Sequence, residues 1–416
     1  MDFSFDQRTE ELRENLTDFL RTHVLAAEHH FAEPSPSAGP AEWSRPPVMA
    51  QLQREARRRG LWNLFLPDSP HGAGLSNVQY APLAEITGHS PLIAPEALNC
   101  AAPDTGNMEL LAMFATQEQK KQWLEPLLEA HIRSAYCMTE PDAASSDASN
   151  IRLRAIRDGD HYVLHGRKWW ATGALAPECA LLVVLAVTDP DAAEPRRRQS
   201  ILLVPRDTPG VRVIRGLSVY GFTDAAHGGH AELEFDNARI PVANLLGAEG
   251  EGARLAQARL GPGRIHHCMR LVGMAERAIE LMCARAEERS TFGRPLAEHG
   301  EVLGWIAEAR LRIDQLRLMV LQAAWLIDLV GAREARTQIS AIKVAAPQTA
   351  QWVIDRAIQV HGAAGLAQDL PLAMLWAQAR GLSFADGPDE VHRMVLGRRE
   401  LEHQRRRREQ TGADAR

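Results

Sequence analysis

The chain of 416 residues is 45% hydrophobic and 24% charged, a composition typical of a globular protein with roughly two to four domains. This composition excludes disordered, fibrous and small disulfide-stapled proteins. The 47 Lys and Arg against 53 Asp and Glu give a formal net charge of -6, which argues against a broad nucleic-acid-binding surface. The five cysteines are scattered and form no C-x-x-C pair. We therefore expect the protein to be located in a reducing compartment and to contain neither a disulfide framework nor a metal site.

The N-terminus does not have the pattern of a signal peptide. Its first residues, MDFSFDQRTEELRENL, are acidic and amphipathic, whereas a signal peptide has a basic end followed by an apolar run. The longest apolar stretch, Ala180 to Val187, is much shorter than the roughly 20 residues that span a bilayer. We expect a cytoplasmic protein without a membrane span.

The first part of the chain has the periodicity of helices. Apolar residues at three- and four-residue steps from Leu12 to Val24 form one face of a helix. The predicted helices cover residues 6–30, 48–59, 77–87 and 96–114. The proline-rich residues 33–47 predict an extended connector. Thr116 followed by Gln119 is a capping-box pattern, which predicts the start of a further short helix.

The middle of the chain has short runs of β-forming residues separated by Gly, Pro and Asp. The predicted strands cover residues 135–138, 151–156, 161–165, 181–187, 201–204 and 232–235. Residues 189–200 have no apolar periodicity, so we expect an exposed loop there.

Long helical patterns return after the β region. They cover residues 253–289, 302–330 and 334–360, with shorter helices beyond residue 371. The order helix, sheet, helix predicts an α+β multidomain protein. We expect an N-terminal helical domain (1–133), a central β domain (134–245), a C-terminal helical bundle (246–400) and a charged tail (401–416).

Two segments of the β region carry side chains that suit a ligand. In YCMTEPDAASSDASN, from Tyr136 to Asn150, a strand ends in a loop whose hydroxyls and backbone N–H groups can bind phosphate or a heteroaromatic edge. In GRKWWATGA, from Gly166 to Ala174, two tryptophans lie beside Thr172. An aromatic ring next to a hydroxyl can cover a planar cofactor and bond its edge. The first segment alone fits an ordinary strand-ending turn equally well, and the second alone fits an ordinary tryptophan in a core equally well.

Together and in this order, the two segments resemble the flavin-binding core of the acyl-CoA dehydrogenase family. The resemblance continues in RLGPGRIHHCMR, RSTFGRPL, IQVHGAAGLAQDLPLA and FADGPDEVHR and covers residues 5 to 400. It implies an N-terminal all-α domain, a central β-barrel or sandwich domain and a C-terminal four-helix bundle. The motifs ASSD, RLGPGRIHH and DGPDEVH look closest to those of the branch that in animals is fused to a kinase-like domain. The kinase-like domain is absent here.

The resemblance implies FAD as the cofactor and assigns residues to it. Met138 and Thr139 would meet the pyrimidine edge of the flavin, Trp170 would cover one face, and Thr172 would bond N5. The remaining implied cofactor contacts are Tyr136, Ser145, Ser146, Arg289, Phe292, Gln359, His361 and Gly362. The loop is one residue longer than the common TEPxxGSD form, so the roles of Ser145 and Ser146 stay open. Arg289 and Phe292 would reach into a neighbouring subunit, which implies a homodimer or homotetramer. Phe292 in a core and His361 in a hydrogen-bonded loop remain alternatives.

The same resemblance places the substrate and the catalytic base. Arg264 would contact the CoA moiety, with a helix-surface ion pair as the alternative. Asp386 takes the position of the family's Glu base, next to Gly387 in the substrate site. Some relatives take their base from the first helix of the bundle, but residues 253–264 contain no acid. Asp386 as a helix N-cap is the other interpretation.

The resemblance implies an FAD-dependent acyl-CoA dehydrogenase of β-oxidation type. Such an enzyme forms a trans-2-enoyl-CoA by α-proton abstraction and β-hydride transfer, and electron transfer flavoprotein reoxidises it. Two alternatives stay open: a flavin oxidase of the same fold acting on a nitroalkane or an acyl-CoA, and a catalytically degenerate scaffold subunit.

Overall fold

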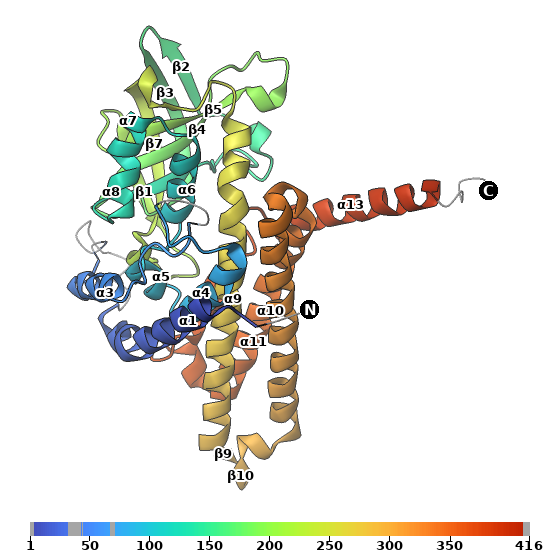
Figure 1. The fold of residues 1–416 in the computed structure, drawn as a ribbon. Helices are drawn as coiled ribbons and strands as arrows, with labels where there is room; N and C mark the ends of the chain where they lie inside the picture. Colours follow the sequence, from blue (N-terminus) through green and yellow to red (C-terminus); the bar gives the residue numbers. More distant parts are fainter. Residues whose placement is uncertain (1–3, 32–42, 44, 67–70, 411–416) are drawn as a thin grey trace. The chain divides into compact units, whose positions relative to one another are not determined.

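The computed structural model describes residues 4–31, 43, 45–66 and 71–410. Most of the expected connector at residues 33–47 lies outside them. The chain forms two compact units, which Figure 1 shows as a ribbon. The first unit contains residues 1–76 and 90–263, and the second contains residues 77–89 and 264–416. The expected domain boundaries stay a prediction.

The first helical segment of the first unit matches its prediction. Helix α1 (Gln7–Phe19) begins where the Asp6 side chain accepts a 2.9 Å hydrogen bond from the Thr9 N–H. It continues through η1 (Leu20–Val24), α2 (Leu25–Ala27) and η2 (Glu28–His30). Helix α3 (Pro47–Arg58) follows with Met49, Leu52 and Ala56 buried.

The single helix predicted over residues 96–114 is wrong. Helix α5 (Ala94–Ala97) ends and α6 (Asp104–Phe114) begins after a break. Asn99 lies in the break with a left-handed φ of 53°, and its amide donates to Asn63 Oδ1 at 2.8 Å. Asn adopts this conformation more readily than most residues. The capping box at Thr116 is confirmed, and it opens α7 (Gln117–Gln119), η4 (Lys120–Leu124) and α8 (Glu125–Leu128).

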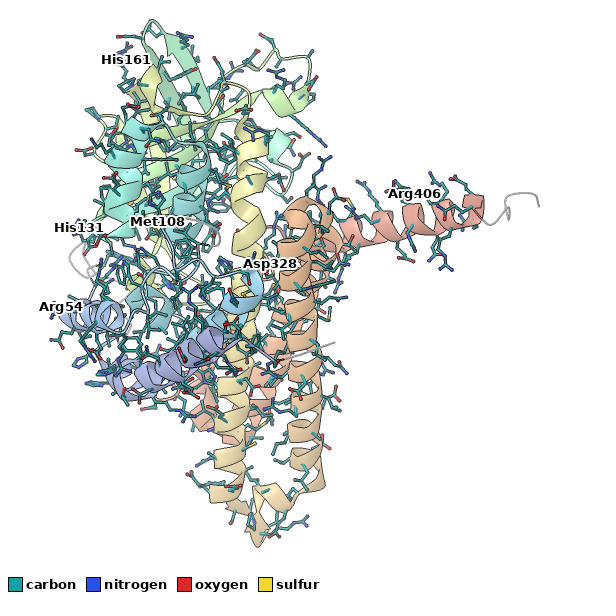
Figure 2. The ribbon with its side chains drawn as sticks, viewed as in Figure 1. Arg54, Met108, His131, His161, Asp328 and Arg406 are labelled. Atoms are coloured by element: carbon teal, nitrogen blue, oxygen red, sulfur yellow. The ribbon has the colours of Figure 1, made fainter. Side chains whose placement is uncertain are left out.

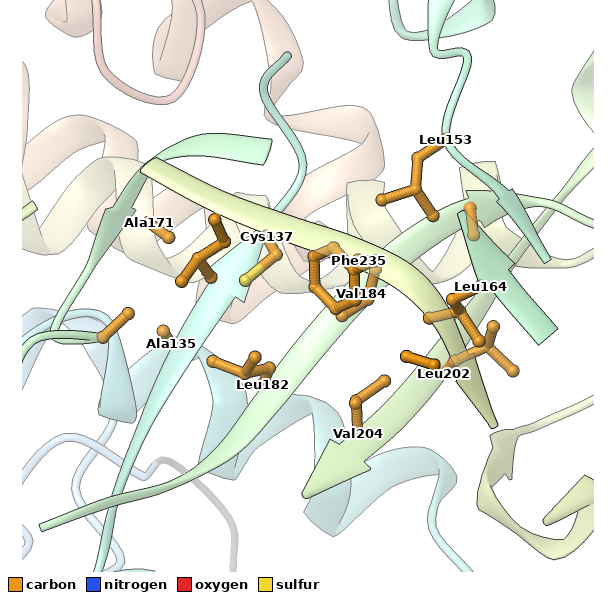
Figure 3. Packing of buried hydrophobic residues seen from close by; sticks show 14 of the residues in the cluster. Ala135, Cys137, Leu153, Leu164, Ala171, Leu182, Val184, Leu202, Val204 and Phe235 are labelled. Atoms are coloured by element: carbon orange, nitrogen blue, oxygen red, sulfur yellow. The ribbon is translucent and has the colours of Figure 1, made fainter. Parts of the chain in front are cut away.

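An eight-stranded sheet forms the β part of the first unit. Its strands are β1 (Arg133–Cys137), β2 (Arg154–Asp158), β3 (His161–Thr172), β4 (Cys179–Val187), β5 (Gln199–Pro205), β6 (Val211–Leu217), β7 (His230–Pro241) and β8 (Leu245–Leu246). The strand order is β6-β7-β3-β2-β4-β5-β8, and β1 pairs in parallel with β4. Figure 3 shows the core that these strands enclose, with Cys137, Val184 and Phe235 among its members.

Three details of the sheet differ from the prediction. Strands β6 and β8 were not predicted, and β3 extends to Thr172 instead of ending at residue 165. Gln199 and Ser200, expected in an exposed loop, are buried at the start of β5.

The second unit is a helical bundle. Its elements are α4 (Asn77–Thr87), the part of α9 (Gly252–Glu288) from Arg264 onward, β9 (Ser290–Thr291), β10 (Arg294–Pro295), η9 (Leu296–Glu298), α10 (Gly300–Glu334), α11 (Arg336–His361), η10 (Gly362–Leu366), α12 (Leu372–Gly381) and α13 (Asp389–Gln410). The segment expected as a charged tail continues α13 as far as Gln410. Figure 2 shows Arg406 on the part of α13 that projects away from α10 and α11.

Close packing and interhelical polar contacts join the helices of this bundle. A Cβ atom on Gly273 of α9 would overlap the carbonyl oxygen of Glu85 on α4, so only glycine permits this approach. Arg317 of α10 donates to the Glu85 carboxylate and to Glu276 of α9. Asp328, labelled in Figure 2, accepts from the backbone N–H of Asn77 at 2.9 Å. These contacts explain why α4 belongs with the bundle.

Among the described residues, α10 alone has the length and composition of a membrane-crossing helix, with a mean hydropathy of 1.3 in its most apolar window. Core helices of soluble proteins meet the same criterion, so this is weak support for a span. One side of α10, here called the α10 apolar face, exposes Leu303, Leu311, Leu318, Trp325 and Leu329. The middle of the helix also carries Arg310, Arg312 and Arg317.

Candidate active site

The ends of β1 and β3 form what we call the strand-end site. Two bonds join the two sequence segments there: the Trp169 N–H donates to the Thr139 carbonyl at 3.0 Å, and Lys168 Nζ donates to the Met138 carbonyl at 2.8 Å. Lys168 is fully buried and also lies 2.8 Å from Glu140 Oε1. The structure therefore brings together the two segments that the sequence predicted separately.

Glu140 holds the loop that follows β1. Its carboxylate accepts from the backbone N–H groups of Arg152 at 2.8 Å and Leu153 at 2.9 Å. Burial lowers the pKa of Lys168, and the charge of Glu140 opposes this shift. Both Lys168 and Glu140 lie within the two sequence segments, but no role was predicted for either. A lysine among the β-forming residues of the second segment was the available signal, since lysine is rarely buried unless it is paired.

The loop gives its two serines different positions. The Ser145 hydroxyl accepts from the Glu140 N–H at 3.0 Å and donates to the Ala143 carbonyl at 3.1 Å. Ser146 is exposed. Ser145 thus shapes the loop, and the hydroxyl of Ser146 faces solvent. Tyr136, on β1, has its ring 4.0 Å from the Arg259 guanidinium.

A bulge in β3 directs Trp170 outward. The pairing of β3 with β7 shifts register between Lys168 and Ala171, and Trp170 has a φ of 52°. Bulges redirect side chains and are common beside active sites. The Trp170 side chain is 39% exposed, with Thr172 half-buried at the end of the same strand. An exposed ring beside a hydroxyl fits a planar heteroaromatic group with a hydrogen-bonding edge.

Thr172 has a partner that sequence analysis missed. Its Oγ1 lies 2.9 Å from Nδ1 of His230, which is opposite Thr172 on β7. Nε2 of His230 lies 2.9 Å from Asp224 Oδ2. Only the long-range pairing of β3 with β7 brings these residues together, so local sequence patterns gave no signal.

In the second unit, three basic side chains hold the segment Leu382–Gly387, which we call the base loop. Lys343 Nζ donates to the carbonyls of Leu382 at 2.8 Å and Ala385 at 2.9 Å. Arg264 Nε donates to the Asp386 carbonyl at 3.0 Å. His392 Nε2 lies 3.4 Å from the same carbonyl, and burial lowers its pKa to about 4. A neutral His392 can donate one N–H to this oxygen.

The backbone of the base loop has an unusual conformation at the expected base. Asp386 has a φ of 56° and Gly387 a φ of 105°. A left-handed non-glycine residue costs energy and is common at functional sites. The Asp386 carboxylate is largely enclosed, with 16% of its side chain exposed, and lies 3.5 Å from His267 Nε2. Helix α13 begins three residues later, at Asp389, so Asp386 does not occupy the N-cap position of the alternative interpretation.

The other expected FAD contacts in the second unit lie on two separate segments. Phe292 lies at the tip of the β9–β10 hairpin with 93% of its surface exposed and a φ of 49°, and Arg289 at the base of the hairpin is also exposed. At the end of α11, Gln359 is exposed and His361 Nδ1 donates to the Ala357 carbonyl at 2.8 Å. Gly362 has a φ of 63°. No hydrogen bond joins the two segments in the described part of the chain. The core alternative for Phe292 is wrong.

Three family models match successive parts of the chain. The acyl-CoA dehydrogenase N-terminal domain matches residues 6–131, the middle domain residues 135–238 and the C-terminal domain residues 250–401. The chain belongs to the acyl-CoA dehydrogenase family. It has the family's N-terminal helical domain, middle β-sheet domain and C-terminal helical domain. This acyl-CoA dehydrogenase is an oxidoreductase with FAD as its cofactor, and the exposed Trp170 ring beside the Thr172 hydroxyl fits the flavin.

Known proteins similar to the chain include FadE2 of Mycobacterium tuberculosis, with 53% identity over 97% of this chain and 98% of that protein. Acyl-CoA dehydrogenase family member 11 of Gallus gallus is 49% identical over 96% of this chain but only 51% of its own length. The chain thus spans about half of that animal relative. A solved structure of a relative from Mycobacterium abscessus matches with a TM-score of 0.92 and 50% identity, over 97% of this chain and 100% of the other.

Proposed function

We propose that the protein converts an acyl-CoA to a trans-2-enoyl-CoA, with Asp386 as the base that removes the α-proton. The observation that carries this proposal is the base loop, which holds an enclosed carboxylate in a left-handed backbone conformation. FAD, when bound, supplies the N5 atom that accepts the β-hydride. A carboxylate in a partly dry site is suited to proton abstraction beside a thioester.

The clamp of the base loop supports this role. Bonds from Lys343 and Arg264 fix the backbone on both sides of the Asp386 Cα. The side chain of Asp386, which is shorter than that of the family's Glu base, therefore starts from a fixed position. Positioning of this kind is costly to disturb, because small displacements of a base slow proton transfer. The Asp386 bond uses one of the five N–H donors of Arg264. Other donors of the same guanidinium can bind the CoA moiety, as we expect from the resemblance.

The cofactor contacts are proposed on the same basis. In the first unit, Met138, Thr139, Trp170 and Thr172 would hold the isoalloxazine ring, with Ser146 as the exposed hydroxyl for a phosphate or the thioester. In the second unit, the open space around Gly362 permits close backbone approach to the dinucleotide. Gln359 and His361 precede that position at the end of α11.

We propose that the protein acts as a homodimer or homotetramer. The exposed Phe292 at the hairpin tip, with Arg289 beside it, suits insertion into the FAD site of a second copy. The α10 apolar face is a second surface that a partner copy would cover, since large contiguous apolar patches usually mark interaction sites. We also propose that the protein is cytoplasmic. We propose electron transfer flavoprotein as the acceptor of the electrons from its reduced flavin.

The direct test of the base is Asp386→Asn, which keeps the shape of the side chain and removes the proton acceptor. We expect FAD and acyl-CoA binding to persist while anaerobic flavin reduction by substrate falls at least ~100-fold, the low end of what a positioned base contributes. Asp386→Glu should also be impaired, because its longer arm displaces the carboxylate.

Two neighbouring acids provide matched controls. Asp389, in the first turn of α13, accepts from Gln348 Nε2 at 3.1 Å, and Glu390 is exposed. Asp389→Asn and Glu390→Gln should reduce flavin at near-normal rates. Loss of reduction in either neighbour, with near-normal reduction in Asp386→Asn, would assign the base elsewhere.

The electron acceptor distinguishes the proposed dehydrogenase from the oxidase alternative. An oxidase would consume oxygen in proportion to product, whereas the proposed dehydrogenase requires electron transfer flavoprotein or an artificial acceptor for turnover. Stoichiometric oxygen consumption with an acyl-CoA or a nitroalkane would favour the oxidase.

A further inference from the structure

Asp224, His230 and Thr172 form a hydrogen-bonded chain that ends at the strand-end site. Thr172 and His230 are direct partners across the β3–β7 ladder, and their Oγ1 and Nδ1 atoms are 2.9 Å apart. His230 Nε2 is 2.9 Å from Asp224 Oδ2. Asp224 and His230 are each 8% exposed, while Thr172 is half-buried. The chain thus leads from a buried carboxylate to a hydroxyl at the edge of the site.

The loop that carries Asp224 is fixed to the end of β3. Asp224 has a left-handed φ of 54°, and the Gly229 N–H donates to its carbonyl at 3.0 Å. The Gly173 N–H donates to the Gly229 carbonyl at 2.8 Å, and the Leu175 N–H donates to the Gly228 carbonyl at 3.0 Å. These bonds tie the backbone of Asp224 to the end of the strand that bears Thr172.

The chemistry of the three groups assigns the hydrogens. An ionised Asp224 can only accept, so Nε2 of His230 carries a hydrogen; we take the neutral ring, in which Nδ1 carries none. Nδ1 of a neutral His230 is then an acceptor, and the Thr172 hydroxyl must donate to it. The hydroxyl hydrogen is thereby committed to His230, and toward any other partner the oxygen of Thr172 can only accept, through its lone pairs.

We infer that Asp224 and His230 are positioning residues that make the Thr172 hydroxyl a hydrogen-bond acceptor toward the flavin N5. The inference rests on the proposed function, which places Thr172 at N5. In oxidised flavin N5 is itself an acceptor, whereas in reduced flavin N5 carries a hydrogen and donates. A Thr172 hydroxyl held by His230 therefore binds the reduced cofactor better than the oxidised one, which raises the midpoint potential.

The test measures the midpoint potential of the flavin bound to the holoenzyme. This potential gives the preference of the protein for reduced over oxidised FAD, that is, the ratio of its affinities for the two forms. Asp224→Asn removes the carboxylate that fixes the His230 tautomer while keeping the size of the side chain. We expect this preference to fall by about tenfold, or about 30 mV in a two-electron couple, because a single hydrogen bond contributes on this scale. In a Thr172→Val background, Asp224→Asn should produce no further change.

Two further variants serve as controls. Thr172→Ser retains a hydroxyl and should keep the wild-type preference. His161→Gln changes a histidine at the opposite end of β3 whose Nδ1 is 2.5 Å from Asp160 Oδ1, and it should leave the preference unchanged. If Asp224→Asn does not fold, His230→Gln replaces it in the same cycle, with the same expected dependence on Thr172.

The possible failures can be told apart. An equal shift from Asp224→Asn in both backgrounds, or no shift with Thr172 present, overturns the positioning role. An unchanged preference in Thr172→Val alone means that Thr172 does not contact N5, which overturns the inference together with the proposed flavin contact. The base assignment is separate, because Asp386→Asn is scored by the rate of flavin reduction by substrate.

Discussion

Among single residues, buried charges fix both the strand-end site and the elements behind it. Lys168 and Glu140 are paired at 2.8 Å, and Arg133 contacts Glu96 at 2.5 Å and Asp104 at 2.9 Å. Removing one partner of such a pair typically costs about 3–5 kcal/mol, because the other charge stays buried without compensation. The pairs therefore hold their loops in one arrangement.

Glu109 on α6 is a buried acid whose carboxylate oxygens have no hydrogen-bond partner in the described part of the chain. Burial raises its pKa to about 8, although the charge of Arg259 opposes the shift. The unfolded chain ionises Glu109 near pH 4.3, so between roughly pH 5 and 8 folding takes up a proton. This contribution to stability is present at low pH and is lost as the pH rises toward 8.

Glu109→Gln should remove this pH dependence. We expect the free energy of unfolding of the variant to gain on the wild type by up to about 1.4 kcal/mol per pH unit between roughly pH 5 and 8. Urea unfolding at several pH values measures the difference. If the free energy of unfolding changes with pH in the same way in both proteins, Glu109 is ionised in the folded protein.

How well a residue could be predicted depends on the range of its contacts. The Thr116–Gln119 capping box needs only neighbours three residues apart, and it is confirmed. Asp386 was assigned from a motif, and its role stays a prediction. The chain from Asp224 through His230 to Thr172 could not be predicted, because strand pairing joins residues 58 positions apart.

At the level of elements, the β9–β10 hairpin carries the clearest signal of a partner copy. Phe292 is 93% exposed and has a left-handed conformation, so packing within its own chain does not explain an aromatic side chain at this position. We expect Phe292→Ser and Arg289→Ala each to weaken FAD binding at least ~10-fold. Burying one Phe contributes about 1.5–3 kcal/mol, and a hydrogen bond between charged groups, as between Arg289 and the FAD pyrophosphate, contributes a similar amount. FAD titration of the apoenzyme measures the effect.

The matched control for the hairpin is Ile156→Ser, because Ile156 is 58% exposed on β2. It should leave FAD affinity unchanged. Sedimentation of the active species as a monomer, or wild-type FAD affinity in both hairpin variants, would contradict the proposed sharing of the site between subunits.

Long elements were predicted better than short or polar ones. The helical patterns over residues 253–289 and 334–360 correspond to α9 and α11, since apolar periodicity over many turns is a strong signal. The end of β3 was missed because Lys168, buried against Glu140, interrupts the apolar alternation. Strand β6 reads VRVIRGL, and its partly alternating start was a signal that could have been used.

At the level of the whole molecule, the helical and β domains supply different parts of the proposed chemistry. The strand-end site of the first unit provides the exposed ring and hydroxyl suited to a flavin. The base loop of the second unit provides an enclosed carboxylate on a clamped backbone. Family membership explains why these features occur in one chain, and the dehydrogenation of an acyl-CoA thioester is the central claim that they support.

The most direct measurement mixes the oxidised holoenzyme anaerobically with a panel of saturated acyl-CoA thioesters from butyryl-CoA to palmitoyl-CoA. We expect bleaching of the flavin by at least one thioester, formation of the trans-2-enoyl-CoA in equal amount, and slower bleaching when the α-hydrogens are replaced by deuterium. Failure of every thioester to bleach the flavin, while a nitroalkane bleaches it, would show that the enzyme does not dehydrogenate acyl-CoA thioesters.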